Sequence, residues 1–460
     1  MTLQEYVHSL QDKRIAVIGI GVSNTPLIEL LCKNGCDVTA CDKRSREQMG
    51  AEAERLESLG AKLSLGEDYL EGLDQDIIFR TPGLMPFDKH LLAARERGSR
   101  ITSEMEAFFM LCPCPVVAVT GSDGKTTTTT IISELLKAQG YHVHLGGNIG
   151  HPLLCEVPEI EEGDVAVLEL SSFQLHSMEC RPHTAVITNI SPNHLDKHLD
   201  YQDYIDAKRS IFLGQQAEDR LVLNLDDAQS RYYASSAKSQ ISYFSDRNFA
   251  ETGTFCREER ICRIDRGQVE EIMRRHEILL PGEHNVLNYL AAFEATRGLV
   301  DASVCRQVAM QFKGVEHRLE RVRELHGVTY INDSIGSSPS RTIAGLRALK
   351  RKPILIAGGY DKHIPFNELG DELCLRAKHV FLTGDTAEKI RTAIAASKFF
   401  PESGLDVTMV EDFDEAVGQA AAAAEEGDIV LLSPACASFD HFRNFAERGD
   451  HFKKIVMELE

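Results

Sequence analysis

One short stretch has the residue types and the spacing that bind a phosphate chain: Thr120-Gly121-Ser122-Asp123-Gly124-Lys125-Thr126-Thr127. An apolar run, residues 115–119, precedes it, and a helical pattern over residues 128–139 follows it and stops at Gly140. A strand, a glycine loop and a helix in this order point backbone N–H groups and the positive end of the helix at an anion. Lys125 can reach the β- and γ-phosphates, and the hydroxyl of Thr126 can bind Mg²⁺. The stretch therefore predicts an ATP or GTP site.

The stretch departs from the usual P-loop pattern at one position. That pattern has a glycine five residues before Gly124, where this chain has Val119. The alternative interpretation is a glycine turn that only joins a strand to a helix. Because Gly-Lys-Thr at a strand-to-helix junction is a specific combination, we favour nucleotide binding.

Further polar residues end the neighbouring strands of the same segment. Glu169 follows the apolar run 164–168, and a carboxylate beside a phosphate loop is the usual partner of Mg²⁺. The alternative is a solvated glutamate at a strand end. The strand at 184–188 leads into a loop with His194 and Asp196, which could converge on the same cation, whereas His198 could equally be a surface residue.

Three other polar residues of this segment have open interpretations. Lys208 lies in a helical pattern, where a solvated lysine is the default expectation. Asn285 and Asn288 lie three residues apart in a predicted helix over 283–295 and therefore share a face. Their amides could bind the edge of a base or cap the helix, and the sequence leaves both interpretations open.

The last segment places polar residues at the ends of several predicted strands. His317-Arg318 opens it, Asn332-Asp333-Ser334 ends its first strand, and Gly358-Gly359-Tyr360-Asp361-Lys362 ends its second. The last strand leads into Ser433-Pro434-Ala435-Cys436-Ala437-Ser438-Phe439-Asp440. A doubly wound sheet binds its ligand at the carboxyl ends of its strands, so these turns predict a ligand site. Connecting turns are the alternative.

Composition and length limit the class of protein. A chain of 460 residues exceeds what one hydrophobic core supports, so two or three domains are expected. The net charge of −20 argues against sequence-independent nucleic-acid binding. No apolar run is long enough to cross a bilayer and the first residues lack the apolar core of a signal peptide, so we expect a cytoplasmic protein without membrane insertion. We expect its 12 scattered cysteines to be reduced thiols.

The pattern of strands and helices predicts an α/β fold with three domains. Residues 1–104 begin with a Rossmann-like strand–helix–strand unit over 14–42. Residues 105–314 hold the phosphate loop and a β-rich region at about 220–280. Residues 315–460 alternate strands and helices as a second doubly wound domain, with strands at 328–332, 353–358, 379–383, 407–410 and 428–433 and a helix at 339–349 capped by Ser338.

The motifs together resemble the Mur ligase family over essentially the whole chain. They are the phosphate loop, Gly147-Asn148-Ile149-Gly150, the run at 168–174, the loop at Asn193-His194, the run at 284–288, His317-Arg318 and the run at 432–440. The first few also resemble folylpolyglutamate synthases. Ser171-Ser172-Phe173-Gln174 and the run at 433–440 favour the D-glutamate-adding members of the family.

The resemblance implies an ATP-dependent amide ligase of peptidoglycan precursor synthesis, which adds D-glutamate to UDP-N-acetylmuramoyl-L-alanine through an acyl phosphate. It implies that the first domain binds the UDP substrate, the second ATP and the third the amino acid. Two Mg²⁺ sites are implied at Thr126, Glu169, His194 and Lys208, the last as a carbamate formed with CO₂. The implied catalytic residues are Lys125, Glu169, His194 and Lys208.

The resemblance also implies the remaining binding residues. ATP is expected at residues 121–127, Asn285, Asn288, Arg318, Asp333 and Lys362; the UDP substrate at Ser23, Asp42, Lys43, Arg44, Thr81 and Asn148; and D-glutamate at Lys362, Ser438 and Phe445.

Two residues depart from the family pattern. Many relatives have a lysine near the nucleotide where this chain has Ile335, although Ser337 can still supply a hydroxyl. Asp123 takes the place of a commoner asparagine, and we have no physical account of that choice.

Three other functions are compatible with part of the pattern. One is a ligase of the same family that adds a different amino acid. Another is a dehydrogenase, indicated by Gly19-Ile20-Gly21 and Asp42, but Asn24 occupies the place of the third glycine and the phosphate loop is left unexplained. The third is a non-catalytic nucleotide-dependent switch, which does not need the strand-end residues of the last segment.

Overall fold

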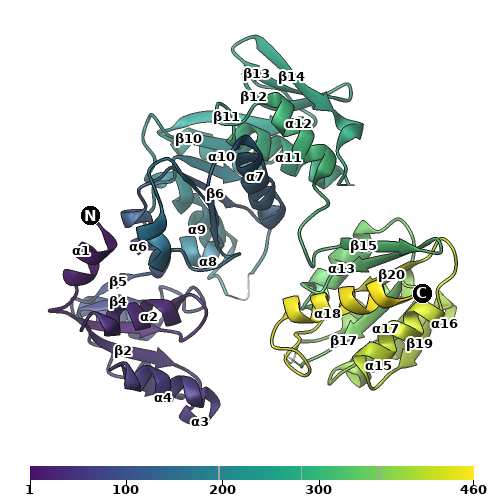
Figure 1. Cartoon of the computed structure of the whole chain (residues 1–460), viewed down its shortest axis with the longest axis horizontal. Coiled ribbons are helices and arrows are strands. Elements are labelled where there is room, and N and C mark those ends of the chain that lie inside the picture. The colour runs from purple at the N-terminus through teal and green to yellow at the C-terminus, as the bar shows by residue number, and fades with distance from the viewer. Residues whose placement is uncertain (195–196, 281, 362–363) are drawn as a thin grey trace. The chain divides into compact units, whose positions relative to one another are not determined.

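A computed structural model describes residues 1–194, 197–280, 282–361 and 364–460. The chain divides into two compact units, Met1–Phe312 and Lys313–Glu460, each built of sheets flanked by helices (Figure 1). The first unit contains two sheets and the second unit one.

The first sheet has five parallel strands in the order β3-β2-β1-β4-β5. Its strands are β1 Arg14–Ile18, β2 Asp37–Asp42, β3 Lys62–Leu65, β4 Ile77–Phe79 and β5 Arg100–Thr102. The accompanying helices are α1 Leu3–His8, α2 Asn24–Lys33, α3 Arg46–Met49, α4 Ala51–Ser58 and α5 Lys89–Glu96. The predicted Rossmann-like unit is confirmed, because β1 and β2 are parallel neighbours joined by α2.

The second sheet has nine strands in the order β14-β13-β12-β11-β10-β9-β6-β8-β7. Its strands are β6 Val116–Thr120, β7 Val143–Gly147, β8 Val165–Glu169, β9 Thr184–Ile187, β10 Arg220–Asn224, β11 Gln240–Ser245, β12 Thr252–Arg257, β13 Arg260–Asp265 and β14 Gln268–Arg274. The strands from β7 to β12 are parallel, and β13 and β14 join as an antiparallel meander. This meander lies within the β-rich region that the sequence predicts.

Helices pack on both faces of the second sheet. They are α6 Glu104–Leu111, α7 Lys125–Gln139, α8 Ser172–Leu175, α9 Tyr201–Leu213, α10 Ala228–Tyr233, α11 Glu283–Ala295 and α12 Ala302–Gln311, with short 3₁₀ turns at Leu154–Glu159, Ala234–Ser236 and Arg275–Glu277. Val117 and Val119 of β6 pack with α7 and α11, whereas Ala118 belongs to the core that contains Tyr204 of α9. Because both faces of β6 are covered, its sequence is an unbroken apolar run.

The third sheet has the order β15-β16-β20-β17-β18-β19. Its strands are β15 Glu320–Leu325, β16 Val328–Asn332, β17 Ile354–Gly358, β18 His379–Thr383, β19 Asp406–Met409 and β20 Ile429–Leu432. Its helices are α13 Pro339–Ala348, α14 Asn367–Arg376, α15 Ala387–Ala396, α16 Phe400–Ser403, α17 Phe413–Ala422 and α18 Phe445–Glu458. All neighbours are parallel except the pair β15 and β16, which form an antiparallel hairpin.

The strand β15 was not predicted from the sequence, whereas the predicted N-cap position at Ser338 is confirmed. Four of the six residues at 320–325 are charged and the pattern does not alternate, and β15 lies at the edge of the sheet and is only partly buried. Ser338 precedes α13 as predicted, but its side chain makes no capping hydrogen bond and its hydroxyl lies 3.3 Å from that of Ser340. Pro339 occupies the first position of α13 and has no backbone N–H group, so one donor fewer needs a capping partner.

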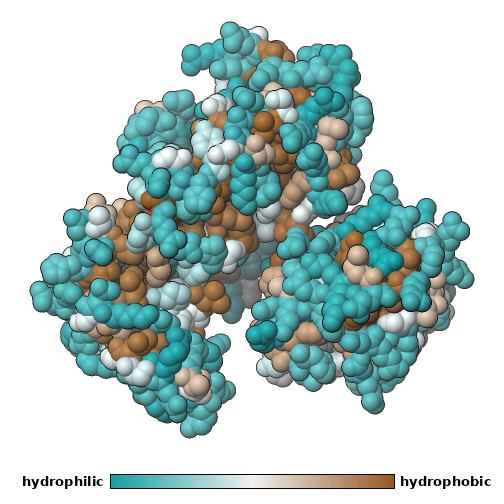
Figure 2. Space-filling model, in the orientation of Figure 1, coloured by the Kyte–Doolittle hydropathy of each residue, from teal (hydrophilic) through white to brown (hydrophobic). Residues whose placement is uncertain are grey.

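The predicted α/β fold class is confirmed, and the division at residues 104, 105, 314 and 315 stays a prediction. No described helix combines the length and the apolar composition that a bilayer crossing requires. Figure 2 shows a mostly hydrophilic face, in keeping with a net charge of −20.

Candidate active site

The predicted phosphate loop joins β6 to α7. Gly124 caps α7 in the left-handed conformation (φ 78°), and Gly121 has φ 149°. A Cβ at Gly121 would overlap the hydroxyl of Thr188, and a Cβ at Gly124 would overlap the amide oxygen of Asn288. Only glycine combines this backbone with these neighbours, so the two glycines shape the loop.

Residues that follow β9 hold the loop from its other side. Asn189 accepts from the backbone N–H of Asp123 at 2.9 Å through its side chain and from that of Ser122 at 2.9 Å through its carbonyl. The hydroxyl of Thr188 donates to the carbonyl of Asp123 at 2.6 Å, and the hydroxyls of Ser122 and Tyr204 lie 2.8 Å apart. The sequence analysis missed these supports. Their only signal is position, because β9 neighbours β6.

Two lysines meet at the loop. The ammonium group of Lys125 donates to the carbonyls of Gly121 at 3.0 Å and Ser122 at 2.9 Å. Lys208 of α9 donates to the same Gly121 carbonyl at 2.7 Å and lies 4.7 Å from the ring centroid of Tyr204. Lys208 is only 1% exposed, so the default expectation of a solvated helical lysine is wrong.

The surroundings of Lys208 disfavour its charged form. Burial is the main cause that lowers its pKa well below the ordinary value, and the charge of Lys125 lowers it further. Glu169 and Asp123 act in the opposite direction but do not compensate. A buried lysine with a lowered pKa can supply a neutral amine, which is the nucleophilic form.

Glu169 ends β8 beside the loop. It pairs with Val119 of β6 on one side and with Gly147 of β7 on the other. Its Oε1 atom accepts from the side chain of Asn148 at 2.7 Å, whereas its buried Oε2 atom has no hydrogen-bond partner among the described residues. Glu169 is 1% exposed, so a solvated strand-end glutamate is excluded.

The Oε2 atom of Glu169, which has no partner among the described residues, is a possible ligand for Mg²⁺. A buried carboxylate oxygen without a partner is costly, and hard divalent cations take oxygen ligands. Thr126, in the first turn of α7, offers a hydroxyl, and His194 offers a ring nitrogen. The carboxylate of Glu169 therefore fits Mg²⁺.

His194 lies in the exposed loop before α9. The next two residues, 195–196, lie outside the described residues, and the predicted ligand Asp196 is one of them. His194 has a positive φ of 55°, and its ring centroid lies 5.0 Å from that of Phe173. Its carbonyl accepts from the N–H groups of Lys197 and His198, each at 3.1 Å.

His198 is buried rather than on the surface. Its Nδ1 atom lies 2.7 Å from a carboxylate oxygen of Asp203, and its Nε2 atom lies 3.0 Å from the hydroxyl of Ser172. Burial is the main cause that lowers its pKa, against the opposing effect of Asp203. Because His176 binds the other oxygen of Asp203 at 2.8 Å, this cluster fixes α8 to the start of α9.

Asn285 and Asn288 lie in the first half of α11, against α7. The amide oxygen of Asn288 accepts from Thr128 at 3.3 Å, and its amide nitrogen donates to Asn285 at 3.1 Å. Gly282 precedes α11 without a side-chain cap. The contact of Asn288 is therefore with α7 and the glycine loop, and capping of the helix does not explain it.

The predicted UDP-substrate residues gather at the carboxyl ends of β1 and β2. Asp42 accepts from the backbone of Ile20 at 2.8 Å and from the guanidinium of Arg44 at 3.0 Å. Burial alone raises the pKa of Asp42, but the hydrogen bonds from Arg44 and Ile20 outweigh it and hold the pKa below its usual value. Ser23 and Lys43 are exposed at the same edge.

Thr81 lies against Gly19 of this first sheet. An ideal Cβ at Gly19 would lie 3.0 Å from the Cβ of Thr81. The preceding residue, Arg80, is buried and donates to the carbonyls of Phe173 at 3.1 Å and His176 at 2.5 Å. The sequence analysis missed this contact, which joins the strand-end loop before Thr81 to α8 of the second sheet.

In the second unit, Asp333 ends β16 as predicted. Its carboxylate accepts from the hydroxyl of Ser433 at 2.7 Å and from the N–H of Leu319 at 3.2 Å. Burial raises its pKa to about 6. Arg318, next to Leu319, is exposed, so Asp333 holds the segment that carries Arg318.

The predicted amino-acid residues lie near the carboxyl end of β20. Ser438 is buried, and the ring centroid of Phe445 lies 6.0 Å from that of His317. Lys362 lies outside the described residues.

Arg448, a buried arginine of α18, was not predicted as a site residue from the sequence. Its guanidinium donates to the carbonyls of Ala437 and Cys436, each at 3.1 Å, and of Ser334 at 3.0 Å, and to the hydroxyl of Ser334 at 3.1 Å. Burial lowers its pKa to about 10. Arg448 thereby ties the turns after β16 and β20 together.

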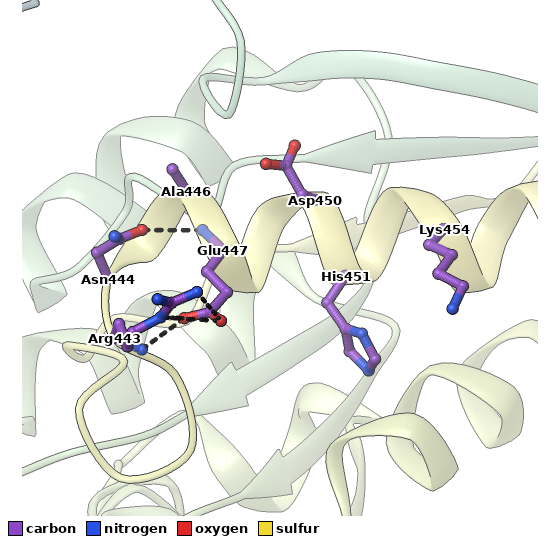
Figure 3. Close-up of a pocket in the computed structure, with 7 residues that line it drawn as sticks. All are labelled: Arg443, Asn444, Ala446, Glu447, Asp450, His451 and Lys454. Atoms are coloured by element: carbon purple, nitrogen blue, oxygen red, sulfur yellow. Dashed lines mark hydrogen bonds and ion pairs between the residues drawn. The ribbon is translucent and has the colours of Figure 1, made fainter.

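A surface depression lies along α18, where Arg443 and Asn444 both bond Glu447 (Figure 3). It is lined by Arg443, Asn444, Ala446, Glu447, Asp450, His451 and Lys454, and none of these is a predicted site residue.

Comparisons with known proteins identify the family. Two family models match this chain: "Mur ligase middle domain" over residues 119–296 and "Mur ligase, glutamate ligase domain" over residues 317–436. A protein of Acetivibrio thermocellus named UDP-N-acetylmuramoylalanine–D-glutamate ligase is 49% identical over 461 residues, which cover 100% of this chain and 99% of the relative. The chain belongs to the Mur ligase family. A relative of the same name from Clostridium novyi is 46% identical over 100% of this Mur ligase and 99% of its own length.

Solved structures agree with this Mur ligase in fold. MurF from Acinetobacter baumannii aligns with a TM-score of 0.60 and 16% identity, covering 100% of this chain and 99% of that one. A UDP-N-acetylmuramate-alanine ligase of Thermotoga maritima aligns with a TM-score of 0.56 and 18% identity, covering 97% and 99%. At this level of identity the two structures support only the fold of this Mur ligase. They give no evidence about the reaction that it catalyses.

Proposed function

We propose that this chain is an ATP-dependent ligase that joins D-glutamate to UDP-N-acetylmuramoyl-L-alanine in peptidoglycan precursor synthesis. The observation that carries the proposal is the full-length similarity, at 49% identity, to a relative named for this ligation. The glycine loop with Lys125, the buried Lys208 and the buried Glu169 support ATP-driven chemistry at the second sheet.

The chemistry requires activation of a carboxylate, because oxide is a poor leaving group. Phosphoryl transfer from ATP to the substrate carboxylate forms an acyl phosphate, and the deprotonated amine of D-glutamate then displaces phosphate. Lys125 and the N–H groups at the start of α7 neutralise charge on the transferred group. Mg²⁺, when bound, adds further neutralisation of the phosphate oxygens.

We infer two Mg²⁺ sites among Thr126, Glu169, His194 and Lys208. Lys208 takes part after its neutral amine adds to CO₂, which forms a carbamate and releases one proton. Burial supports this step because it lowers the pKa of Lys208 and so supplies the neutral amine. The product is an anion in place of an ammonium, which suits a metal-binding position.

The binding residues follow the three-domain division of the chain. Residues 1–104 bind the UDP end through Ser23, Asp42, Lys43, Arg44 and Thr81, with Asn148 of the second domain at the muramoyl part. Residues 105–314 bind ATP through the loop, with Asn285 and Asn288 at the adenine. Residues 315–460 contribute Arg318, Asp333 and Lys362 to the nucleotide and Lys362, Ser438 and Phe445 to D-glutamate. Because the reaction consumes ATP, we place it in the cytoplasm.

The decisive experiment measures phosphate release with Mg·ATP and UDP-N-acetylmuramoyl-L-alanine while the amino acid is varied. D-glutamate, L-glutamate, L-lysine and meso-diaminopimelate are offered in turn, and product mass is the check. We expect release and a D-glutamyl product with D-glutamate alone. Activity with another amino acid would change the substrate and keep the ligase chemistry. No amino-acid-dependent release from folded, ATP-binding protein would overturn the proposal.

A further inference from the structure

A second group of metal-ligating side chains lies away from the phosphate loop. His142 and His144 flank the first residue of β7, and Asp164 directly precedes β8. The Nε2 atom of His144 lies 2.8 Å from Oδ2 of Asp164, and the Nδ1 atom of His142 lies 3.3 Å from the same oxygen. The three ligand atoms lie within 4.8 Å of one another.

The backbone builds this arrangement. Residues two apart in an extended chain point to the same side, so His142 and His144 share a face of β7. Strands β7 and β8 are parallel with Val143 opposite Val165, and the N–H of Val165 donates to the carbonyl of His142 at 3.0 Å. This register places Asp164 beside both imidazoles, whose ring centroids are 4.6 Å apart.

The group is suited to a cation in charge and access. Asp164 supplies the one carboxylate of the group, and its Oδ2 atom also accepts from the N–H of Glu161 at 2.9 Å. The side chains of His144 and Asp164 are 9% and 10% exposed, whereas that of His142 is 71% exposed. An ion can therefore enter from solvent past His142.

We propose that His142, His144 and Asp164 bind a divalent transition metal ion of the Zn²⁺, Ni²⁺ or Co²⁺ class. Two imidazoles and one carboxylate at bond lengths near 2.0–2.2 Å require ligand atoms about 3.3 Å apart in a tetrahedral site. The distances to Asp164 of 2.8 Å and 3.3 Å need only small side-chain shifts to reach this spacing. Two imidazoles among three ligands favour these ions over Mg²⁺, which prefers a set made mostly of oxygen ligands.

A second histidine cluster among the described residues is less suited to an ion. His176, His198 and Asp203 also bring their ligand atoms within 4.8 Å of one another. Both ring nitrogens of His198 are already engaged, by Asp203 and by Ser172, and the ring is stacked with Phe173 at 5.4 Å. An ion there would have to break a buried network.

The proposed ion would join β7 to β8 at their amino ends. The carboxyl ends of the same two strands lead to Asn148 and Glu169, which are hydrogen-bonded at 2.7 Å. Five residues of strand separate the two positions by about 16 Å. The ion would therefore stabilise the pairing of β7 with β8 and would take no part in the ligation reaction.

The test is titration of the dialysed full-length protein with Ni²⁺ and Co²⁺ in buffer that contains Mg²⁺. His142→Ala is the main variant, because an exposed side chain can be removed without loss of the fold, and His144→Ala is the second. His151→Ala is the matched control, since His151 is exposed and pairs with a single carboxylate, Glu156. Visible absorption of bound Co²⁺ reports ligand geometry, and the unfolding temperature reports stabilisation.

We expect one ion per chain in the native protein and in His151→Ala, and at least tenfold weaker binding in both His142→Ala and His144→Ala. Saturating Ni²⁺ should raise the unfolding temperature of the native protein and not that of His142→Ala. Equal binding by the native protein and by folded His142→Ala would overturn the proposal, and so would an absence of binding at 100 µM metal.

Discussion

The ammonium groups of Lys125 and Lys208 share one acceptor, the carbonyl oxygen of Gly121, at 3.0 Å and 2.7 Å. Lys208 is 1% exposed, and this burial disfavours its charged form. The neighbouring charge of Lys125 lowers the pKa of Lys208 further. The pair therefore explains why a residue in an ordinary helical pattern has the properties of a reactive amine.

The buried ammonium of Lys208 should destabilise the protein in a pH-dependent way. Its folded-state pKa lies below the unfolded value near 10.5, so the unfolded chain binds more protons between these two values. The penalty is thus complete below the folded-state pKa and disappears as the pH approaches 10.5. In bicarbonate-free buffer, Lys208→Met should unfold at higher urea concentration than the native protein at pH 7, and the gap should narrow toward pH 10. Circular dichroism at several pH values measures both midpoints.

The matched control is Lys137→Met, which removes an exposed lysine from α7. It should shift the urea midpoint little and equally at every pH. A gap for Lys208→Met that stays constant with pH would contradict a pKa shift at this lysine.

The carbamate proposal predicts chemical rescue at the same position. Lys208→Ala should lower turnover at least a hundredfold, because it removes an anionic group from the metal-binding residues. Formate, acetate or propionate can place a carboxylate in the vacated space and should restore turnover at least tenfold. Native protein in ¹³C-bicarbonate should show a carbamate carbon signal that Lys208→Ala lacks. Normal turnover in Lys208→Ala would refute the role.

The two glycine caps of α7 should respond differently to the same substitution. Gly124 and Gly140 both have positive φ, 78° and 106°, so alanine strains the backbone at either end by about 1 kcal/mol. Only at Gly124 does the added Cβ overlap another residue, Asn288, since nothing lies within 4 Å at Gly140. Gly124→Ala should therefore weaken ATP binding at least tenfold, whereas Gly140→Ala should lower stability and leave ATP affinity unchanged. Calorimetric ATP titration distinguishes them, and equal affinity losses would contradict the loop assignment.

The Oε2 atom of Glu169, which has no hydrogen-bond partner among the described residues, predicts a metal-dependent defect. Glu169→Gln keeps the size of the side chain and removes the charge, so phosphate release should fall at least a hundredfold and require more Mg²⁺ for half-maximal rate. The matched control is Glu104→Gln, because Glu104 is also buried, bonds the N–H of Leu154 at 3.0 Å and has a pKa raised by burial to about 7. It should keep near-native rates. An unchanged Mg²⁺ requirement in Glu169→Gln would exclude Glu169 as a ligand.

Much of the fold could be predicted because apolar runs and turn residues dominate it locally. The strand before the phosphate loop, the end of α7 at Gly140 and α11 over Glu283–Ala295 follow from buried strands, a left-handed glycine cap and helical periodicity. The edge strand β15 could not be recognised from the sequence, because its residues show no strand pattern. Its hydrogen bonds come from antiparallel pairing with β16.

The contacts of the candidate site depend on tertiary neighbours. Lys208, Glu169 and His198 each have a plausible surface interpretation from sequence, and each is buried because a strand or helix far away in the chain covers it. Asn189 and Arg448 carry no motif, although they hold loops of the two units through backbone hydrogen bonds. Such residues are found only when the donors and acceptors of each loop are traced.

Asp333 should make the stability of the protein fall with rising pH between about 4 and 6. Its folded-state pKa of about 6 exceeds the ordinary 3.8, so the folded protein keeps a proton in this window that the unfolded chain has lost. The resulting penalty is complete above pH 6 and amounts to about 3 kcal/mol. Asp333→Asn has no proton to lose, so its free energy of unfolding relative to the native protein should rise by up to about 3 kcal/mol from pH 4 to pH 7. Urea unfolding across this range, with the exposed Asp385→Asn as control, measures the difference. A difference that does not vary with pH would show that Asp333 is already ionised at pH 4.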